Sequence, residues 1–161
     1  MVDVYEISAV VAAVGVLVGV VYYILDMRQQ MQVRQTSMVM GLYSTFGSTD
    51  FQKAYQTVRN MEFKDYADYM KRYGKDVEVG AAFWTVTIFF EGIGILAKRG
   101  LIKMELVIDL FGYPITKTWE KVASPVKGLR EADKDPGICE WFEYLYNEMQ
   151  KREQKPEQST A

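Results

Sequence analysis

The sequence has no histidine and a single cysteine, Cys139, among its 161 residues. Without histidine, the chain has no imidazole to act as a general base and lacks the side chain that completes most zinc sites. A lone cysteine forms no internal disulfide, which is typical of a protein in a reducing compartment. Walker, EF-hand and complete dinucleotide-binding motifs are missing as well. The sequence therefore predicts no metal site and no cofactor site.

A strong excess of charge of either sign is also lacking. The chain has 19 basic and 21 acidic residues and a net charge of −2. Residues 1–26 contain three acidic residues and no basic one, which leaves residues 27–161 with a net charge of +1. A nearly neutral chain produces no strong electrostatic field, so we expect no nucleic-acid partner.

Near its start, the sequence contains a run without charge from Ile7 to Leu25. As a helix with a rise of about 1.5 Å per residue, this run is roughly 28 Å long, close to the hydrocarbon thickness of a bilayer. A cleaved signal peptide is one alternative, but acidic residues precede the run and no small-residue cleavage site follows it. A core helix is the other, but it would carry polar residues at helical spacing. We interpret the run as an uncleaved signal anchor that spans the cell membrane once.

Basic residues near the run lie only on its C-terminal side, at Arg28 and Arg34. The positive-inside rule then predicts that the N-terminus lies outside the cell and the C-terminal domain in the cytoplasm. Within the run, small residues recur on one side of the helix, at Ser8, Ala12, Gly15 and Gly19. Such a stripe allows two helices to approach closely in lipid, so we predict a second copy or a partner membrane protein there.

Patterns after the run predict an all-α protein. The anchor helix is expected to continue as a juxtamembrane stalk to Leu42, which gives an anchor-and-stalk segment over residues 1–42. Ser44 to Asp50 is a turn cluster in which Ser48 or Thr49 caps the next helix. Apolar residues then recur at helical spacing, which predicts a cytoplasmic helical bundle over residues 43–152. The polar residues 153–161 are expected to form a disordered tail.

Turn residues divide the second half of the bundle into short helices. Gly112 is expected to end one helix, Pro114 to open another, and Ser124-Pro125 to restart or kink the chain. A last helix follows Asp135-Pro136-Gly137, with one apolar face made by Ile138, Trp141, Phe142, Leu145 and Met149.

The strongest apolar segment inside the bundle runs from Val79 to Ala97 and has one charged residue, Glu91. It is long enough to be a second membrane span, but a carboxylate is expensive in lipid, which favours a buried helix. Arg130 is the best candidate partner for Glu91, and Glu143 could converge on the same arginine. The functional interpretation makes Glu91, Glu143 and Arg130 candidates for acid–base catalysis. We favour the structural interpretation, a buried ion pair that fixes helix packing.

The segment FFEGIGILAKRGLIKMELVIDLFGYPITKTWEKVASPVKGLRE, with the later WFEYL, resembles a prokaryotic family known as domain-of-unknown-function family 4760. The resemblance rests on Phe90-Glu91, Trp119, Arg130 and Phe142-Glu143, and extends from about Phe51 to Met149. It implies one N-terminal span followed by a helical cytoplasmic domain, and no established activity. We therefore expect a membrane-anchored protein-interaction module, either a scaffold or an accessory subunit of a membrane complex. The alternatives are an anchored enzyme that uses Glu91 or Glu143, and a two-span protein.

Overall fold

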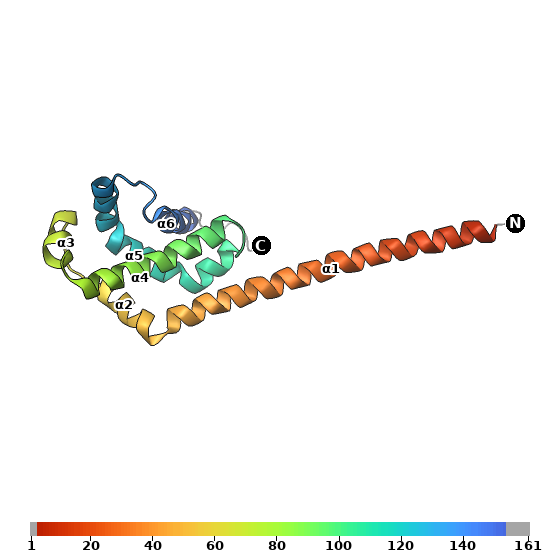
Figure 1. The fold of residues 1–161 in the computed structure, drawn as a ribbon, viewed down its shortest axis with the longest axis horizontal. Coiled ribbons are helices and arrows are strands. Elements are labelled where there is room, and N and C mark those ends of the chain that lie inside the picture. Colours follow the sequence, from red (N-terminus) through yellow and green to blue (C-terminus); the bar gives the residue numbers. More distant parts are fainter. Residues whose placement is uncertain (1–2, 154–161) are drawn as a thin grey trace. The chain divides into compact units, whose positions relative to one another are not determined.

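The computed structural model describes residues 3–153, and for residues 4–7, 9, 10 and 153 it describes the backbone alone. Six helices and no strands make up this part of the chain, so the predicted all-α fold is confirmed (Figure 1). The helices are α1 (Val4–Gly47), α2 (Thr49–Asn60), α3 (Tyr66–Tyr73), α4 (Val77–Lys98), α5 (Met104–Asp133) and α6 (Glu140–Glu153). Nearly all of the predicted tail lies outside the described residues.

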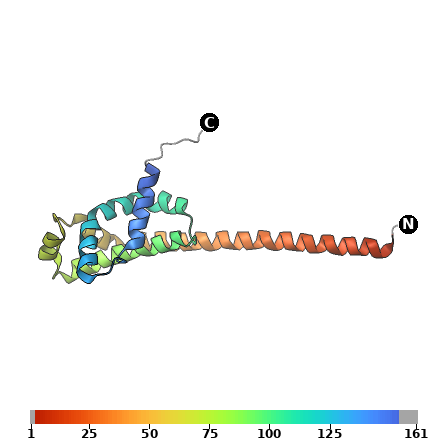
Figure 2. The same cartoon turned by 90° about the horizontal axis from the view of Figure 1, so that it is seen from above.

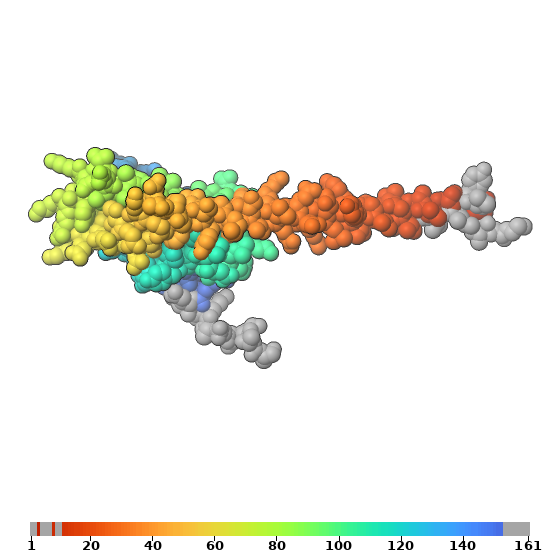
Figure 3. Space-filling model, turned by 90° about the horizontal axis from the view of Figure 1, so that it is seen from below, coloured from red at the N-terminus to blue at the C-terminus, as the bar shows by residue number. Residues whose placement is uncertain are grey.

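Contacts divide the chain into two units, Met1–Met40 and Gly41–Ala161. The division falls inside α1, because the apolar run and the predicted stalk form one continuous helix. In the first unit, every described side chain from Val11 to Leu25 is exposed. Figure 3 shows one face of this segment, coloured red to orange. The assignment of the second unit to the cytoplasm stays a prediction.

The predicted turn cluster is shorter in the structure than we expected. α1 continues to Gly47 and α2 begins at Thr49, so the expectation of a turn from Ser44 onward is wrong. The hydroxyl groups of the predicted turn bond to carbonyls of α1 instead: Thr45 Oγ1 donates to the Gly41 carbonyl at 3.0 Å and Ser48 Oγ to the Thr45 carbonyl at 2.8 Å. Ser48 Oγ also accepts a hydrogen bond from the Phe51 amide, which confirms Ser48 as the cap of α2.

α5 is one helix of 30 residues, so the predicted end at Gly112 and the predicted helix start at Pro114 are wrong. Of the two alternatives at Ser124-Pro125, a restart or a kink, the restart is wrong. Proline inside a helix removes a hydrogen bond and bends the axis, and the path of α5 bends along its length (Figures 1 and 2). Burial favours continuation nonetheless, because apolar side chains recur at helical spacing on both sides of Pro114 and all of them lie in the core: Val107, Phe111, Ile115, Trp119, Val122 and Val126.

α4 is the central helix of the second unit, where it packs against α2 and α6. Its inward face consists of fully buried residues, Phe83, Val86, Phe90 and Ile93. Aromatic rings from other helices pack against Phe90, namely Phe46 at the end of α1 and Phe142 of α6, and Phe51 of α2 packs against the neighbouring Phe89. The predicted apolar face of α6 is confirmed for Phe142, Leu145 and Met149, which are buried. Trp141 is only partly buried, and Ile138 is partly buried and precedes the helix.

α6 crosses α4 at a glycine (Figure 2). A Cβ atom placed on Gly94 would meet backbone and Cβ atoms of Trp141 well inside van der Waals contact distance. Because the backbone atoms of Trp141 belong to the first turn of α6, they cannot move aside without shifting that helix. Gly94 therefore sets how closely α4 and α6 approach each other.

We predict that Gly94→Ala lowers the free energy of unfolding by about 2–3 kcal/mol, because the added methyl group overpacks the crossing. Gly92→Ala is the matched control, since nothing lies within 4 Å of its Cβ position. That substitution should stabilise α4 by about 0.5–1 kcal/mol through helix propensity alone. Denaturant unfolding of the detergent-solubilised chain, followed by circular dichroism, measures both. Equal effects of the two substitutions would contradict the proposed role of Gly94.

Candidate functional site

Glu91 lies one helical turn before Gly94 and binds the start of α6. Its Oε2 accepts a hydrogen bond from the Phe142 amide at 2.7 Å, and its Oε1 accepts one from the Trp141 amide at 3.2 Å. The first amides of a helix have no partner within that helix, and the N-terminus attracts negative charge. A carboxylate supplied by α4 thus caps α6.

Two opposing effects act on the pKa of Glu91. Partial burial of the carboxyl group raises the pKa, and the neighbouring Glu140 carboxylate raises it further. The hydrogen bonds from the two α6 amides and the charge of Arg130 lower it. Burial prevails, so the pKa of Glu91 lies above its ordinary value.

Arg130 pairs with Glu143 and not with Glu91. Arg130 Nη1 lies 2.6 Å from Glu143 Oε2, and Arg130 Nε donates to the Ile138 carbonyl at 2.8 Å. The arginine and glutamate side chains are 17% and 32% exposed, so solvent screens this pair only partly. The predicted meeting of Arg130 and Glu143 is therefore confirmed. The predicted ion pair of Glu91 with Arg130 is wrong, because the α6 amides occupy both Glu91 oxygens.

Cys139 precedes α6 in a left-handed backbone conformation, with φ of 57°. The residue is buried, and its carbonyl accepts the Glu143 amide at 3.1 Å. Burial, together with the nearby Glu91 carboxylate, raises the pKa of the Cys139 thiol to about 11. The thiol is therefore protonated at neutral pH and is a poor nucleophile.

Aromatic stacking joins the same three helices beneath the polar groups. The Phe90 and Phe142 rings stack with their centroids 4.9 Å apart, and the Trp119 ring meets Phe142 edge-on at 5.0 Å. All six residues that carry the family resemblance thus meet where α4, α5 and α6 join: Phe90, Glu91, Trp119, Arg130, Phe142 and Glu143.

The predicted helix-association residues are all on α1, far along the sequence from this junction. Ser8 and Ala12 are exposed, and nothing lies within 4 Å of the Cβ positions of Gly15 and Gly19. These four residues belong to the first unit, whereas Glu91, Arg130 and Glu143 belong to the second.

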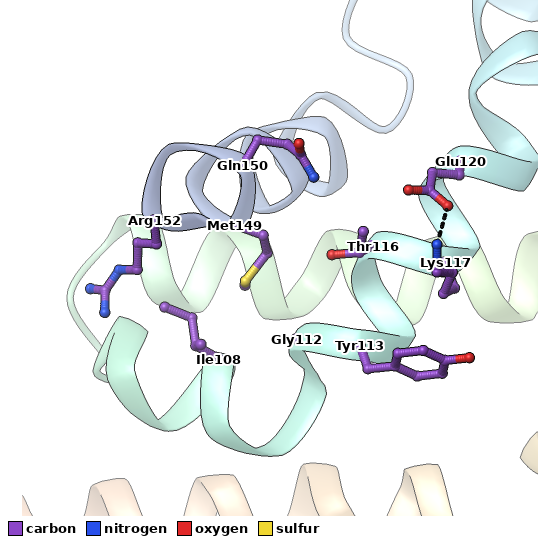
Figure 4. Close-up of a pocket in the computed structure, with 9 residues that line it drawn as sticks. All are labelled: Ile108, Gly112, Tyr113, Thr116, Lys117, Glu120, Met149, Gln150 and Arg152. Atoms are coloured by element: carbon purple, nitrogen blue, oxygen red, sulfur yellow. Dashed lines mark hydrogen bonds and ion pairs between the residues drawn. The ribbon is translucent and has the colours of Figure 1, made fainter. Parts of the chain in front are cut away.

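Surface grooves of the second unit are built from other residues. One of about 490 Å³ lies between α5 and α6, with Ile108 and Met149 facing each other across it and Tyr113 at its edge (Figure 4). The ion pair between Lys117 and Glu120, 2.8 Å long, forms one side of this groove. Among the described residues, no group of three or more His, Cys, Asp or Glu side chains is arranged to hold a metal ion.

A comparison with known families assigns the chain to one of them. The family described as Domain of unknown function (DUF4760) matches residues 9–149, and the chain belongs to this family. Searches of curated proteins and of solved structures found no match. The match begins inside α1, so the family extends over the apolar helix as well as the helical bundle.

The junction is built to hold helices together. Both oxygens of Glu91 accept backbone hydrogen bonds, and Arg130 is held by a carbonyl and a carboxylate. The sequence pointed to these residues through charges inside apolar segments. It did not reveal the helix caps of Asp65 and Asp76, although an aspartate before a helical pattern is a known signal for such caps.

We predict that Glu91→Gln destabilises the protein by about 1–2 kcal/mol at neutral pH, because only one oxygen remains for two amides. The loss should be larger in acid. A carboxyl group whose folded pKa is raised contributes stability that is fully present below its unfolded pKa, near 4.5, and is lost as the pH rises through the folded pKa. Glutamine does not titrate, so unfolding measured from acid to neutral pH tests this difference. Glu78→Gln, at an exposed site on the same helix, is the control and should change stability little. A cost that grows with pH would contradict this assignment.

Proposed function

We propose that this protein is a helical interaction module that α1 anchors in a lipid bilayer. The observation that carries this proposal is the exposure of α1. Val11, Leu17 and Tyr22 are 64%, 65% and 72% exposed on a stretch with no charged residue. So large an apolar surface is unfavourable in water, whereas lipid tails solvate it without cost.

Two helices, α1 and α4, are long and apolar enough to cross a membrane. Their burial separates them. None of the residues in the most apolar stretch of α1 is buried, whereas 39% of those in the most apolar stretch of α4 are. α4 would also have to carry Glu91 into lipid and give up its bonds to α6, which favours a single span. The basic residues Arg28 and Arg34 support a cytoplasmic second unit.

The second unit leaves one face of α4 uncovered, and this face supports a role in binding protein. Val77, Trp84 and Ile88 are 84%, 41% and 62% exposed, and Ala81 between them is also exposed. Their spacing places all four on one side of the helix. An apolar groove lined by Ala54, Ala82 and Thr85 continues this surface toward α2. Apolar surface of this kind fits a helix of a second copy or of another membrane protein.

The enzyme alternative draws less support from the geometry. A general acid needs an open path to substrate, but the Glu91 carboxylate is occupied by α6, and the Glu143 carboxylate by Arg130. The arrangement therefore favours binding over catalysis.

We predict that the full chain remains in the membrane pellet after carbonate extraction. Leu17→Arg with Val18→Arg should release it to the supernatant, because each central arginine costs about 2.5–3.5 kcal/mol on insertion. Val33→Arg with Met40→Arg adds the same charge at exposed sites beyond the apolar run and should leave the chain in the pellet. Recovery of the unmodified chain in the supernatant would refute the anchor.

We predict that a photo-crosslinking amino acid at Ile88 forms a protein adduct in native membranes, whereas one at the exposed Gln56 of α2 does not. An adduct with the mass of two chains identifies a second copy as the partner. It should then decrease with Gly15→Ile plus Gly19→Ile, which block close approach of two α1 helices, and persist with Val14→Ile plus Val18→Ile. A protein adduct of any other mass identifies another protein. Adducts with lipid alone, or equal protein adducts at Gln56, would contradict the binding role of α4.

A further inference from the structure

We propose that the second unit binds a phosphorylated small molecule between the end of α2 and the middle of α5. A pocket of about 420 Å³ lies there. This volume falls within the range of roughly 300–1,000 Å³ that is usual for small-molecule sites. It exceeds what one phosphate group occupies, so it leaves room for an organic part of the ligand.

Positive charge is concentrated in this pocket. Four basic side chains line it, from Arg59, Lys64, Lys117 and Lys121, against one acidic side chain, from Glu120. In the whole chain the balance is reversed, with 19 basic and 21 acidic residues. A phosphate monoester carries a charge of about −1.5 to −2 near pH 7, which matches the net positive charge of the lining.

The α5 wall of the pocket is polar because this face of the helix takes no part in the core. Lys117, Lys121 and Ser124 recur at the spacing of one helical face. The core residues of the same stretch, Trp119 and Val122, lie on the other side and are buried. Lysine and serine side chains on one face supply donors for phosphate oxygens.

One of these cations is already held in position. Lys121 Nζ donates to the Met61 carbonyl at the end of α2, at 2.8 Å. An ammonium group fixed before the ligand arrives loses less conformational entropy on binding. An ammonium group has three N–H donors, so two of them remain for other acceptors.

An aromatic ring adjoins the charged groups. The half-buried ring of Phe63 lines the pocket and packs edge-on against Tyr69, with centroids 5.4 Å apart. Lys121 Nζ lies 6.0 Å from the centroid of the Phe63 ring. A ligand with a phosphate group and a planar organic part fits this combination, with the planar part on Phe63. A soluble metabolite and a lipid headgroup both offer the phosphate, so the experiment must separate them.

The test uses the full chain in phosphatidylcholine nanodiscs and isothermal titration calorimetry with two probes. Pyrophosphate reports the charge alone, and AMP adds a planar group. We expect both to bind and Phe63→Leu to weaken AMP but not pyrophosphate. Arg59→Gln with Lys64→Gln should weaken both about tenfold or more, since each removes a charged hydrogen-bond donor.

The matched control is Lys53→Gln with Lys71→Gln, which removes the same charge from exposed sites on α2 and α3. It should leave the affinity unchanged, and melting temperatures of both double variants should stay at the wild-type value. Absence of binding to both probes, or an equal loss in the two double variants, would overturn the proposal.

Nanodiscs with phosphatidic acid, compared with phosphatidylglycerol, identify the source of the phosphate. Both lipids are anionic, but only phosphatidic acid carries a phosphate monoester. If the headgroup is the natural ligand, phosphatidic acid alone reduces AMP affinity for the wild-type chain. If a soluble metabolite is the ligand, the two lipids act equally.

Discussion

The second unit depends on one contact, the approach of α6 to α4 at Gly94. The glycine allows the two backbones to meet, and one turn earlier Glu91 accepts hydrogen bonds from the first amides of α6. Three other features follow from this placement. Phe142 stacks on Phe90, Glu143 reaches Arg130, and Cys139 is enclosed at the start of α6. A polar cap and a close backbone contact thus position one helix on another, where apolar packing alone would leave rotation and sliding open.

The two most apolar helices of the chain differ in how much of their surface is buried. α4 places one face in the core against α2 and α6, while its opposite face stays exposed. Along the apolar run of α1, all described side chains from Val11 to Leu25 are exposed. The two segments are alike in length and apolar composition, so burial is the property that distinguishes the exposed helix from the core helix.

The sequence predicted the helical class, the cap at Ser48 and most of the apolar face of α6, because each depends on residues close together in the chain. Prediction from the sequence failed where contacts between residues far apart in the chain determine the structure. Pro114 and Ser124-Pro125 are local signals for helix ends, yet α5 continues through them because residues on both sides are buried together. Glu91 was identified as a buried carboxylate, but its partners are main-chain amides 50 and 51 residues later, which no side-chain pattern records. The positive pocket was missed for the same reason, since Arg59 and Lys64 meet Lys117 and Lys121 only in the folded chain.

The environment of Cys139 also determines how the protein responds to thiol reagents. Its sulfur is enclosed by the fold, and its pKa of about 11 keeps the reactive anion scarce at neutral pH. Alkylating agents and spin labels should therefore react slowly with Cys139 and rapidly with any cysteine introduced at the surface. The natural sequence serves as a background-free host for site-directed labelling, and rapid modification of Cys139 would report local opening at the start of α6.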